Sequence, residues 1–201
     1  MLDIEISSKL GKQLNFIIEI DRVKSILRKA KLFHEDRLEN DAEHSWTICM
    51  MALILHEHAD FAVNIDKVIK MLLVHDIIEI DTGDIFLYDV ERLSITSEVE
   101  AVAAERIFGL LEDEQKRDLM DLWIEFEQKE TPEAKFAAAI DRLEPILQNY
   151  LDEGGTWKAN GITYEMVLEA NQDIKNGSKE IWEFVIKLCD SAVKAGYLER
   201  G

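Results

Sequence analysis

The 201-residue chain has few of the residues that interrupt helices, because it contains only 2 prolines and 9 glycines. Sheets whose strands are joined by many tight turns need more of both. Hydrophobic residues make up 47% of the chain and no low-complexity tract appears, which excludes collagen-like, fibrous and disordered classes. At roughly 150 residues per domain, this length predicts one domain over residues 1–201. The sequence therefore predicts a single all-α domain.

Cysteine is scarce as well, and long apolar runs are missing. Cys49 and Cys189 are the two cysteines, far apart in the chain, so the sequence predicts buried reduced thiols rather than a disulfide framework. The longest apolar run, residues 45–55, is well short of the roughly 20 residues that span a bilayer. Asp3 and Glu5 stand where a signal peptide carries bases. We expect a soluble cytoplasmic protein that does not bind membranes.

Basic residues are much fewer than acidic ones: the chain has 23 basic and 41 acidic residues, which gives a net charge of −18. Such a protein repels phosphate polymers, so we expect no nucleic-acid polymer as a partner. A small phosphate ester remains compatible with this charge, because it needs only a local positive group or a metal ion.

Apolar residues at helical spacing, with capping residues between them, predict helices along the whole chain. The polar stretch 33–40 and the glycines at 154 and 155 predict loops. No alternating pattern predicts a strand of useful length. The expected helices cover residues 8–31, 65–80, 96–111, 113–128, 131–151, 163–174 and 178–195, and another, capped by Asn40 or Asp41, carries Trp46, Cys49, Met50, Leu53 and Ile54 as core.

Three acid–base side chains fall within the strongly apolar helix expected at residues 65–80. His75 and Asp76 stand between apolar runs, and Glu79 follows four and three residues later, on the same helical face. Burying these groups is costly unless they pair with one another or hold a cation. Imidazole and carboxylate ligands suit divalent ions such as zinc, manganese, cobalt or magnesium. A self-satisfied buried His–Asp pair is the alternative.

Two further residues extend this set. His44 lies in the first turn of the helix that Asn40 or Asp41 is expected to cap, and Asp141 lies in an apolar helical stretch. The order His44, His75-Asp76, Asp141 resembles the H…HD…D pattern of the HD-domain metal-dependent phosphohydrolases. Further residues resemble the 5′-deoxynucleotidase branch: Arg37-x-Glu39-Asn40, Glu43-His44-Ser45 and the HDxxExxTGD string from His75 to Asp84. The resemblance covers most of residues 10–150, and residues 151–201 are expected to add C-terminal helices to the same domain.

The resemblance implies a compact multi-helix HD-domain bundle with one divalent ion: manganese, cobalt, zinc, magnesium or iron. His44, His75, Asp76 and Asp141 would bind that ion. Glu79 would orient or deprotonate the metal-bound water, and Asp84 would either protonate the leaving alkoxide or hold the sugar. The implied activity is a phosphomonoesterase that releases nucleoside and phosphate from (deoxy)nucleoside 5′-monophosphates, and the implied assembly is a homodimer.

The substrate phosphate needs a positive partner. We expect Arg37 in this role, because it precedes the first ligand and its planar fork matches phosphate, together with Lys29. Lys29-Ala30 stand where the branch carries Arg-Trp, with Arg28 beside them. That aromatic residue is associated with rejection of the ribose 2′-hydroxyl, so the choice between ribose and deoxyribose stays open.

Other functions remain compatible with this pattern. The chain could hydrolyse ppGpp or a cyclic nucleotide, although Ile80 follows Glu79 where the alarmone hydrolases carry an acid. It could bind nucleotide for regulation without turnover, although a sensor would not need both Glu79 and Asp84. It could also be a helical bundle whose His–Asp contacts serve only folding.

Overall fold

The computed structural model describes residues 8–89 and 96–201. Its first half contains α1 (Lys9–Ile20), the 3-10 helix η1 (Asp21–Ser25), β1 (Leu27–Lys31), β2 (Leu38–Asn40), α2 (Asp41–Leu55), η2 (His56–His58), α3 (Ile65–Val74), η3 (His75–Ile78) and α4 (Glu79–Thr82).

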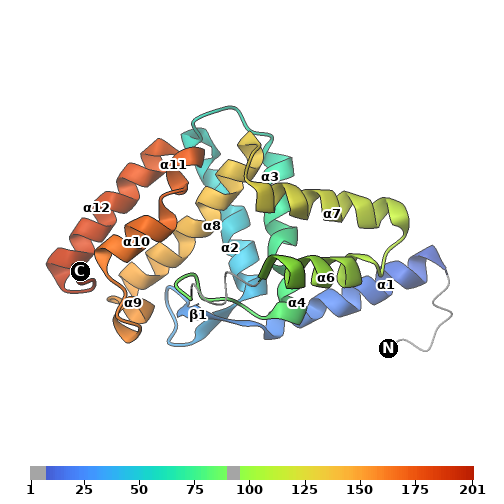
Figure 1. Cartoon of the computed structure of the whole chain (residues 1–201), viewed down its shortest axis with the longest axis horizontal. Coiled ribbons are helices and arrows are strands. Elements are labelled where there is room, and N and C mark those ends of the chain that lie inside the picture. The colour runs from blue at the N-terminus through green and yellow to red at the C-terminus, as the bar shows by residue number, and fades with distance from the viewer. Residues whose placement is uncertain (1–7, 90–95) are drawn as a thin grey trace.

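The second half is helical throughout. Its elements are α6 (Thr96–Phe108), α7 (Asp113–Gln128), α8 (Pro132–Leu151), α9 (Gly155–Ala159), α10 (Tyr164–Asn171), α11 (Ile174–Gly177) and α12 (Lys179–Ala195). In Figure 1, α8 runs through the middle of the molecule, with α9–α12 on one side and α1, α6 and α7 on the other. The all-α fold class is confirmed.

The helix expected over residues 8–31 is wrong in its second half. Ser8 caps α1, which ends at Ile20, and the chain continues through η1 into β1. β1 pairs antiparallel with β2, with Leu27 opposite Asn40 and Lys31 opposite Leu38. The loop expected at residues 33–40 therefore ends as a strand. Pairing between residues 27–31 and residues 38–40 forms this hairpin, and helical periodicity does not report such pairing.

The helix expected over residues 65–80 is also interrupted. α3 ends at Val74, residues 75–78 form the tighter η3, and α4 then runs only to Thr82. Gly83 ends this segment with φ +70°, a backbone conformation that favours glycine. A short 3-10 segment within a helix often marks a functional position, and here it begins at His75.

Buried apolar side chains form two groups. One joins α2, α3 and α8 to α9–α12 and includes Ile48, Leu72 and Ile140. The other joins α1, η1, η3, α6 and α7 and includes Val74 and Phe108. The chain passes from the first group to the second between Leu72 and Val74, directly before His75. Both cores therefore hold this part of the backbone in place.

No helix in the part of the chain that the structure describes is both long enough and apolar enough to cross a membrane.

Candidate metal centre

The His75 ring is oriented by a backbone carbonyl one turn earlier in the chain. It is buried, and its Nδ1 lies 2.8 Å from the carbonyl oxygen of Leu72, one turn earlier. That contact places the proton on Nδ1 and directs Nε2 away from the helix. The Nε2 atom lies 3.0 Å from Asp76 Oδ1 and 3.6 Å from Asp141 Oδ1.

His44 reaches the same point from the first turn of α2. The Asn40 side chain accepts from the Glu43 amide at 3.1 Å, and the Glu43 side chain accepts from the Asn40 amide at 3.1 Å, so a capping box fixes this turn. The His44 ring is fully buried, and its Nε2 lies 3.0 Å from Asp141 Oδ1 and 3.7 Å from Asp76 Oδ2. Its Nδ1 lies 2.8 Å from Glu144 Oε2.

The structure therefore brings together residues from α2, η3 and α8 that are far apart in the sequence. One ligand atom each from His44, His75 and Asp141 lies within 4.8 Å of the others, which is close enough to hold one metal ion. Asp76 borders this group through both of its oxygens. Two imidazoles with two carboxylates form a donor set that suits borderline divalent ions.

A group of three acids lies beside the group formed by His44, His75 and Asp141. One oxygen each from Asp41, Asp76 and Glu79 falls within 4.8 Å of the others. Neither oxygen of the fully buried Asp41 has a hydrogen-bond partner among the described residues, and the same holds for Glu79 Oε2. Asp41 was not expected at the site, because an acid at the start of a predicted helix resembles an ordinary capping residue.

Electrostatics show how strongly these groups depend on one another. Burial by itself lowers the pKa of both histidines, but the neighbouring carboxylates outweigh it and raise the pKa to about 9 for His44 and about 10 for His75. Conversely, burial raises the pKa of Asp141, but both imidazoles hold it well below its usual range. Burial and the neighbouring Asp76 raise the pKa of Glu79 well above its usual value.

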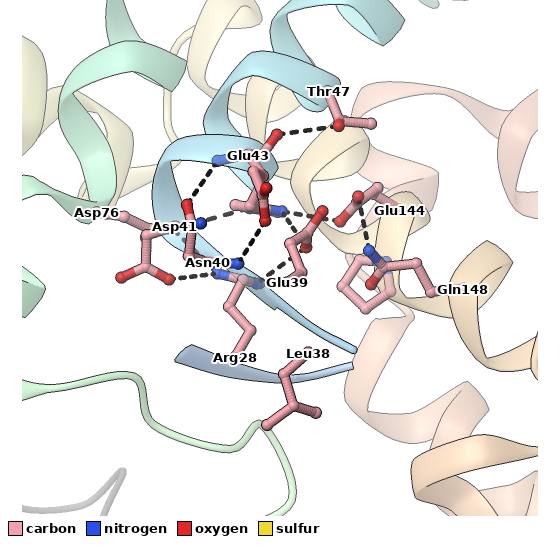
Figure 2. Close-up of polar contacts among 12 residues, drawn as sticks. Arg28, Leu38, Glu39, Asn40, Asp41, Glu43, Thr47, Asp76, Glu144 and Gln148 are labelled. Atoms are coloured by element: carbon pink, nitrogen blue, oxygen red, sulfur yellow. Dashed lines mark hydrogen bonds and ion pairs between the residues drawn. The ribbon is translucent and has the colours of Figure 1, made fainter. Parts of the chain in front are cut away.

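Arg28 on β1 supplies the positive charge inside this site. Its Nη1 donates to Asp76 Oδ2 at 3.1 Å, and its Nε lies 3.6 Å from Glu39 Oε2 (Figure 2). Burial lowers the pKa of Arg28, but Asp76 and Asp141 more than offset this and keep it above its usual value. From the sequence, Arg28 stands out only as a neighbour of Lys29, because a helix over residues 8–31 would not direct its side chain to this site.

A cavity of about 300 Å³ opens beside the centre. Arg28, Lys29, Asp84 and Glu79 line it next to His75, Asp76 and Asp141. Burial raises the pKa of Asp84. The cavity wall also includes aromatic and polar residues: Phe86, Tyr88, Asn149, Thr156, Trp157 and Asn171. This volume is at the small end for ligand sites and fits a compact substrate.

Arg37, which was expected to bind the substrate phosphate, lies outside this cavity. Its Nη2 and Nη1 donate to the Glu43 carboxylate at 2.6 and 2.9 Å, and its Nε donates to Glu35 at 3.1 Å. It is about half exposed and is not among the residues that line the cavity. The structure does not bring Arg37 to the centre, because the capping acid Glu43 engages its guanidinium.

The chemistry of these residues fits a divalent cation. His75 Nε2 is buried and has no hydrogen-bond partner among the described residues, and it faces the same point as His44 Nε2. Buried polar atoms normally have partners, so an unpartnered imidazole nitrogen among carboxylates indicates that a cation belongs there.

Comparisons with known proteins agree with this chemistry. The HD domain family model matches residues 20–182. A crystal structure from Magnetospirillum magnetotacticum MS-1, described as a "Predicted metal-dependent phosphohydrolase", is 47% identical, with a TM-score of 0.88 over 95% of this chain and 98% of that one. The 5′-deoxynucleotidase HDDC2 of Xenopus laevis is 32% identical over 143 residues, covering 70% of each chain. The protein of the same name from Danio rerio is 31% identical over 140 residues, covering 69% of this chain and 68% of that one.

A helical bundle that holds two histidines and several carboxylates around one point defines a candidate metal-dependent hydrolase. The chain belongs to the HD domain family. The resemblance drawn from the H…HD…D residues is confirmed.

Proposed function

We propose that this protein is a metal-dependent 5′-nucleotidase that hydrolyses (deoxy)nucleoside 5′-monophosphates to nucleoside and phosphate. The observation that carries the proposal is the arrangement of His44, His75 and Asp141 beside a cavity lined by Arg28 and Lys29. Its relatives named 5′-deoxynucleotidase and its similarity to a metal-dependent phosphohydrolase support the same reaction.

In this proposal His44, His75, Asp76 and Asp141 hold one divalent ion. When bound, such an ion supplies Lewis acidity, which neutralises phosphoryl charge and acidifies coordinated water. Manganese, cobalt, zinc, magnesium and iron are all compatible with this mixed donor set.

Arg28 and Lys29 bind the substrate phosphate. Arg28 is buried at the cavity wall and hydrogen-bonded to Asp76, so its guanidinium is already oriented when substrate enters. Lys29 follows it on β1 and lines the same cavity. Arg37 stays with Glu43 and stabilises the approach to α2 instead.

Glu79 and Asp84 are the acidic side chains placed to act on the attacking water and on the leaving nucleoside. Glu79 reaches the centre next to Asp76, and its unpartnered Oε2 is suited to accept a proton from the attacking water. Asp84 lies at the cavity wall, where burial raises its pKa. From this position Asp84 would either protonate the leaving 5′-oxygen or hold the sugar.

Phosphate release tests the proposal. Purified protein incubated with a panel of 5′-mononucleotides and Mn²⁺, Co²⁺, Zn²⁺ or Mg²⁺ is expected to release inorganic phosphate. His75→Ala and Asp76→Ala are expected to abolish release, because each removes a ligand that no neighbour replaces. An inert wild type whose melting temperature still rises with nucleotide would instead favour regulatory binding without turnover. Hydrolysis of ppGpp or a cyclic nucleotide, followed by chromatography of the products, without phosphate release from any mononucleotide would favour another phosphate ester.

We also propose that residues 1–201 form one domain and that the protein acts as a cytoplasmic homodimer. Buried apolar contacts link α2 to Leu198 near the end of the chain, which supports a single domain. Trp46, Met50, Leu53 and Ile54 form an exposed apolar stripe on α2, of the kind that subunit interfaces cover. Buried Cys49 and Cys189, both free thiols, are compatible with a reducing compartment. A monomeric mass in solution at micromolar concentration would contradict the dimer.

A further inference from the structure

The two histidines of the metal centre are oriented by different kinds of partner. His75 directs its Nδ1 to the backbone carbonyl of Leu72 at 2.8 Å. His44 directs its Nδ1 to a side chain, Glu144 Oε2, also at 2.8 Å. Both rings thereby present Nε2 to Asp141, at 3.0 Å from His44 and 3.6 Å from His75. Of these two outer contacts, only that of His44 depends on a replaceable side chain.

Glu144 is placed for this contact by α8. It follows Asp141 by three residues and precedes Gln148 by four, so all three lie along one face of the helix. Its second oxygen, Oε1, accepts from Gln148 Nε2 at 3.0 Å (Figure 2). Both carboxylate oxygens therefore have fixed partners, and the group cannot rotate away from His44 without losing one of them.

Neighbouring acids do not duplicate the role of Glu144. Glu39 Oε2 lies 3.8 Å from His44 Nδ1, which is too far for a hydrogen bond. Glu144 is fully buried and is not among the cavity-lining residues, so it does not touch substrate. Glu144 therefore acts on the candidate metal centre only through its contact with His44. A buried carboxylate in a helix interior is costly, and this arrangement gives it a specific use.

We propose that Glu144, held by Gln148, is the positioning residue that makes His44 a metal ligand. A neutral imidazole carries one N–H, and the nitrogen that bears it depends on the partners of the ring. The Glu144 carboxylate keeps that hydrogen on Nδ1, which leaves the Nε2 lone pair free toward Asp141 and the ion. It also increases the donor strength of the ring, as carboxylates behind metal-bound histidines do. This inference rests on the proposed metal site.

Metal affinity is the direct test, because it does not require turnover. Glu144→Gln keeps the size of the side chain but removes its charge and weakens the acceptor, and Glu144→Ala removes the acceptor. Mn²⁺ titration of the chelator-stripped protein is expected to show an affinity about 10- to 100-fold lower than wild type for either variant. At saturating Mn²⁺, the KM for a 5′-mononucleotide is expected to stay near the wild-type value, because the cavity wall is unchanged.

Glu127→Gln is the matched control. Glu127 lines the same cavity and also carries a negative charge, but it does not contact His44. The control removes one charge near the ion without disturbing the imidazole, and its Mn²⁺ affinity is expected to stay within about threefold of wild type. An equal loss in Glu127→Gln and Glu144→Gln would overturn the positioning role, because charge alone would explain it.

Nitrogen-15 NMR of the Zn²⁺-loaded protein gives an independent readout. A slowly exchanging Nδ1–H proton of His44, shifted far downfield by a carboxylate acceptor, is expected in wild type and is expected to move upfield in Glu144→Gln. If the Glu144 variants fail to fold, Gln148→Leu removes one restraint on Glu144 and is expected to lower Mn²⁺ affinity by about 3- to 10-fold, less than loss of the carboxylate itself.

The outcomes separate this inference from the proposed function. Wild-type protein that binds Mn²⁺ and releases phosphate, while both Glu144 variants bind Mn²⁺ equally well, would overturn the positioning role and leave the nucleotidase intact. Wild-type protein that binds none of the four metals would overturn both.

Discussion

At the scale of single residues, Arg28 places a positive charge among the acids of the candidate metal centre in this strongly acidic protein. Arg28 contacts Asp76 at 3.1 Å and lies within 4 Å of Glu39 and Asp41. It is therefore paired with acids of the candidate metal centre and also lines the cavity. Arg37, which the motif pattern favoured, is about half exposed and engaged by Glu43. The two arginines differ in environment rather than in chemistry.

The first prediction compares these arginines. Arg28→Met is expected to lower kcat/KM for a 5′-mononucleotide by about 100-fold or more, because it removes a preoriented charged donor to phosphate. Arg37→Met is expected to stay within about threefold of wild type, since the contacts of Arg37 with Glu35, Leu38 and Glu43 lie outside the cavity. Steady-state kinetics at saturating Mn²⁺ measure both. Equal losses in the two variants would contradict the assignment of phosphate binding to Arg28.

The second prediction concerns pH and the two histidines without metal. Their pKa values are raised to about 9 and about 10 by neighbouring carboxylates, above the ordinary value of about 6.5. A raised histidine pKa contributes stability below the unfolded value, and that stability is lost as pH rises through the folded value. The free energy of unfolding of the metal-free protein is therefore expected to fall between about pH 7 and pH 10.

Urea unfolding of chelator-treated protein at several pH values measures this loss. His44→Gln is the comparison, because a variant without the ring cannot lose that contribution and is expected to show a shallower pH dependence. A metal-free wild type whose stability rises over this range would contradict the charge pairing at the centre.

At the scale of elements, the first turn of α2 matters most for the site, because it carries Asp41, Glu43 and His44 directly after the Asn40 cap. Its capping box closes the turn, and Arg37 in turn holds Glu43. The N-terminal cap of α3 is a useful contrast. There the Asn64 side chain accepts from the Lys67 amide, and His75 lies at the opposite end of the helix.

The third prediction compares these two caps. Asn40→Ala and Asn64→Ala are each expected to lower the free energy of unfolding by about 1 kcal/mol, the usual effect of losing a side-chain cap. Only Asn40→Ala is expected to weaken Mn²⁺ binding as well, because His44 lies in the turn that this cap closes. Chemical denaturation and metal titration of both variants provide the measurement. A comparable loss of Mn²⁺ affinity in Asn64→Ala would show that general destabilisation, not local geometry, controls the site.

At the scale of the whole molecule, the metal centre connects elements that belong to the two cores. His44 and Asp141 come from α2 and α8 of the first core, whereas His75 begins η3, whose apolar side chains join the second. Repulsion among the buried carboxylates destabilises the packing of the two cores at this point, unless a cation or bound protons compensate the negative charge.

The fourth prediction is therefore that metal removal destabilises the fold. An ion present at about 100 times its Kd stabilises the native state by about 2.7 kcal/mol. For a chain of this length that corresponds to a melting temperature about 5–10 °C higher. Differential scanning calorimetry of the metal-loaded protein with and without chelator is expected to show this difference. Asp141→Asn, which lacks a ligand, is expected to show a much smaller one, and no change in a demonstrably loaded wild type would contradict the prediction.

The sequence by itself determined the helical class and the chemical type of the site. Apolar periodicity and scarce breakers report helices because both are local properties. The sequence also indicated the site through His75, Asp76 and Glu79, because burying acids and an imidazole in an apolar helix costs free energy unless they pair or bind a cation. Even Glu144 had a local signal, since it follows Asp141 by one turn.

Only the tertiary structure decided which charges meet. Pairing of β1 with β2 turned an expected helix into a hairpin and aimed Arg28 inward, whereas Glu43 engaged Arg37. The contact of His44 with Glu144 joins residues 100 positions apart. Contacts of this kind depend on how elements pack, and the spacing of residues along one element carries no information about them.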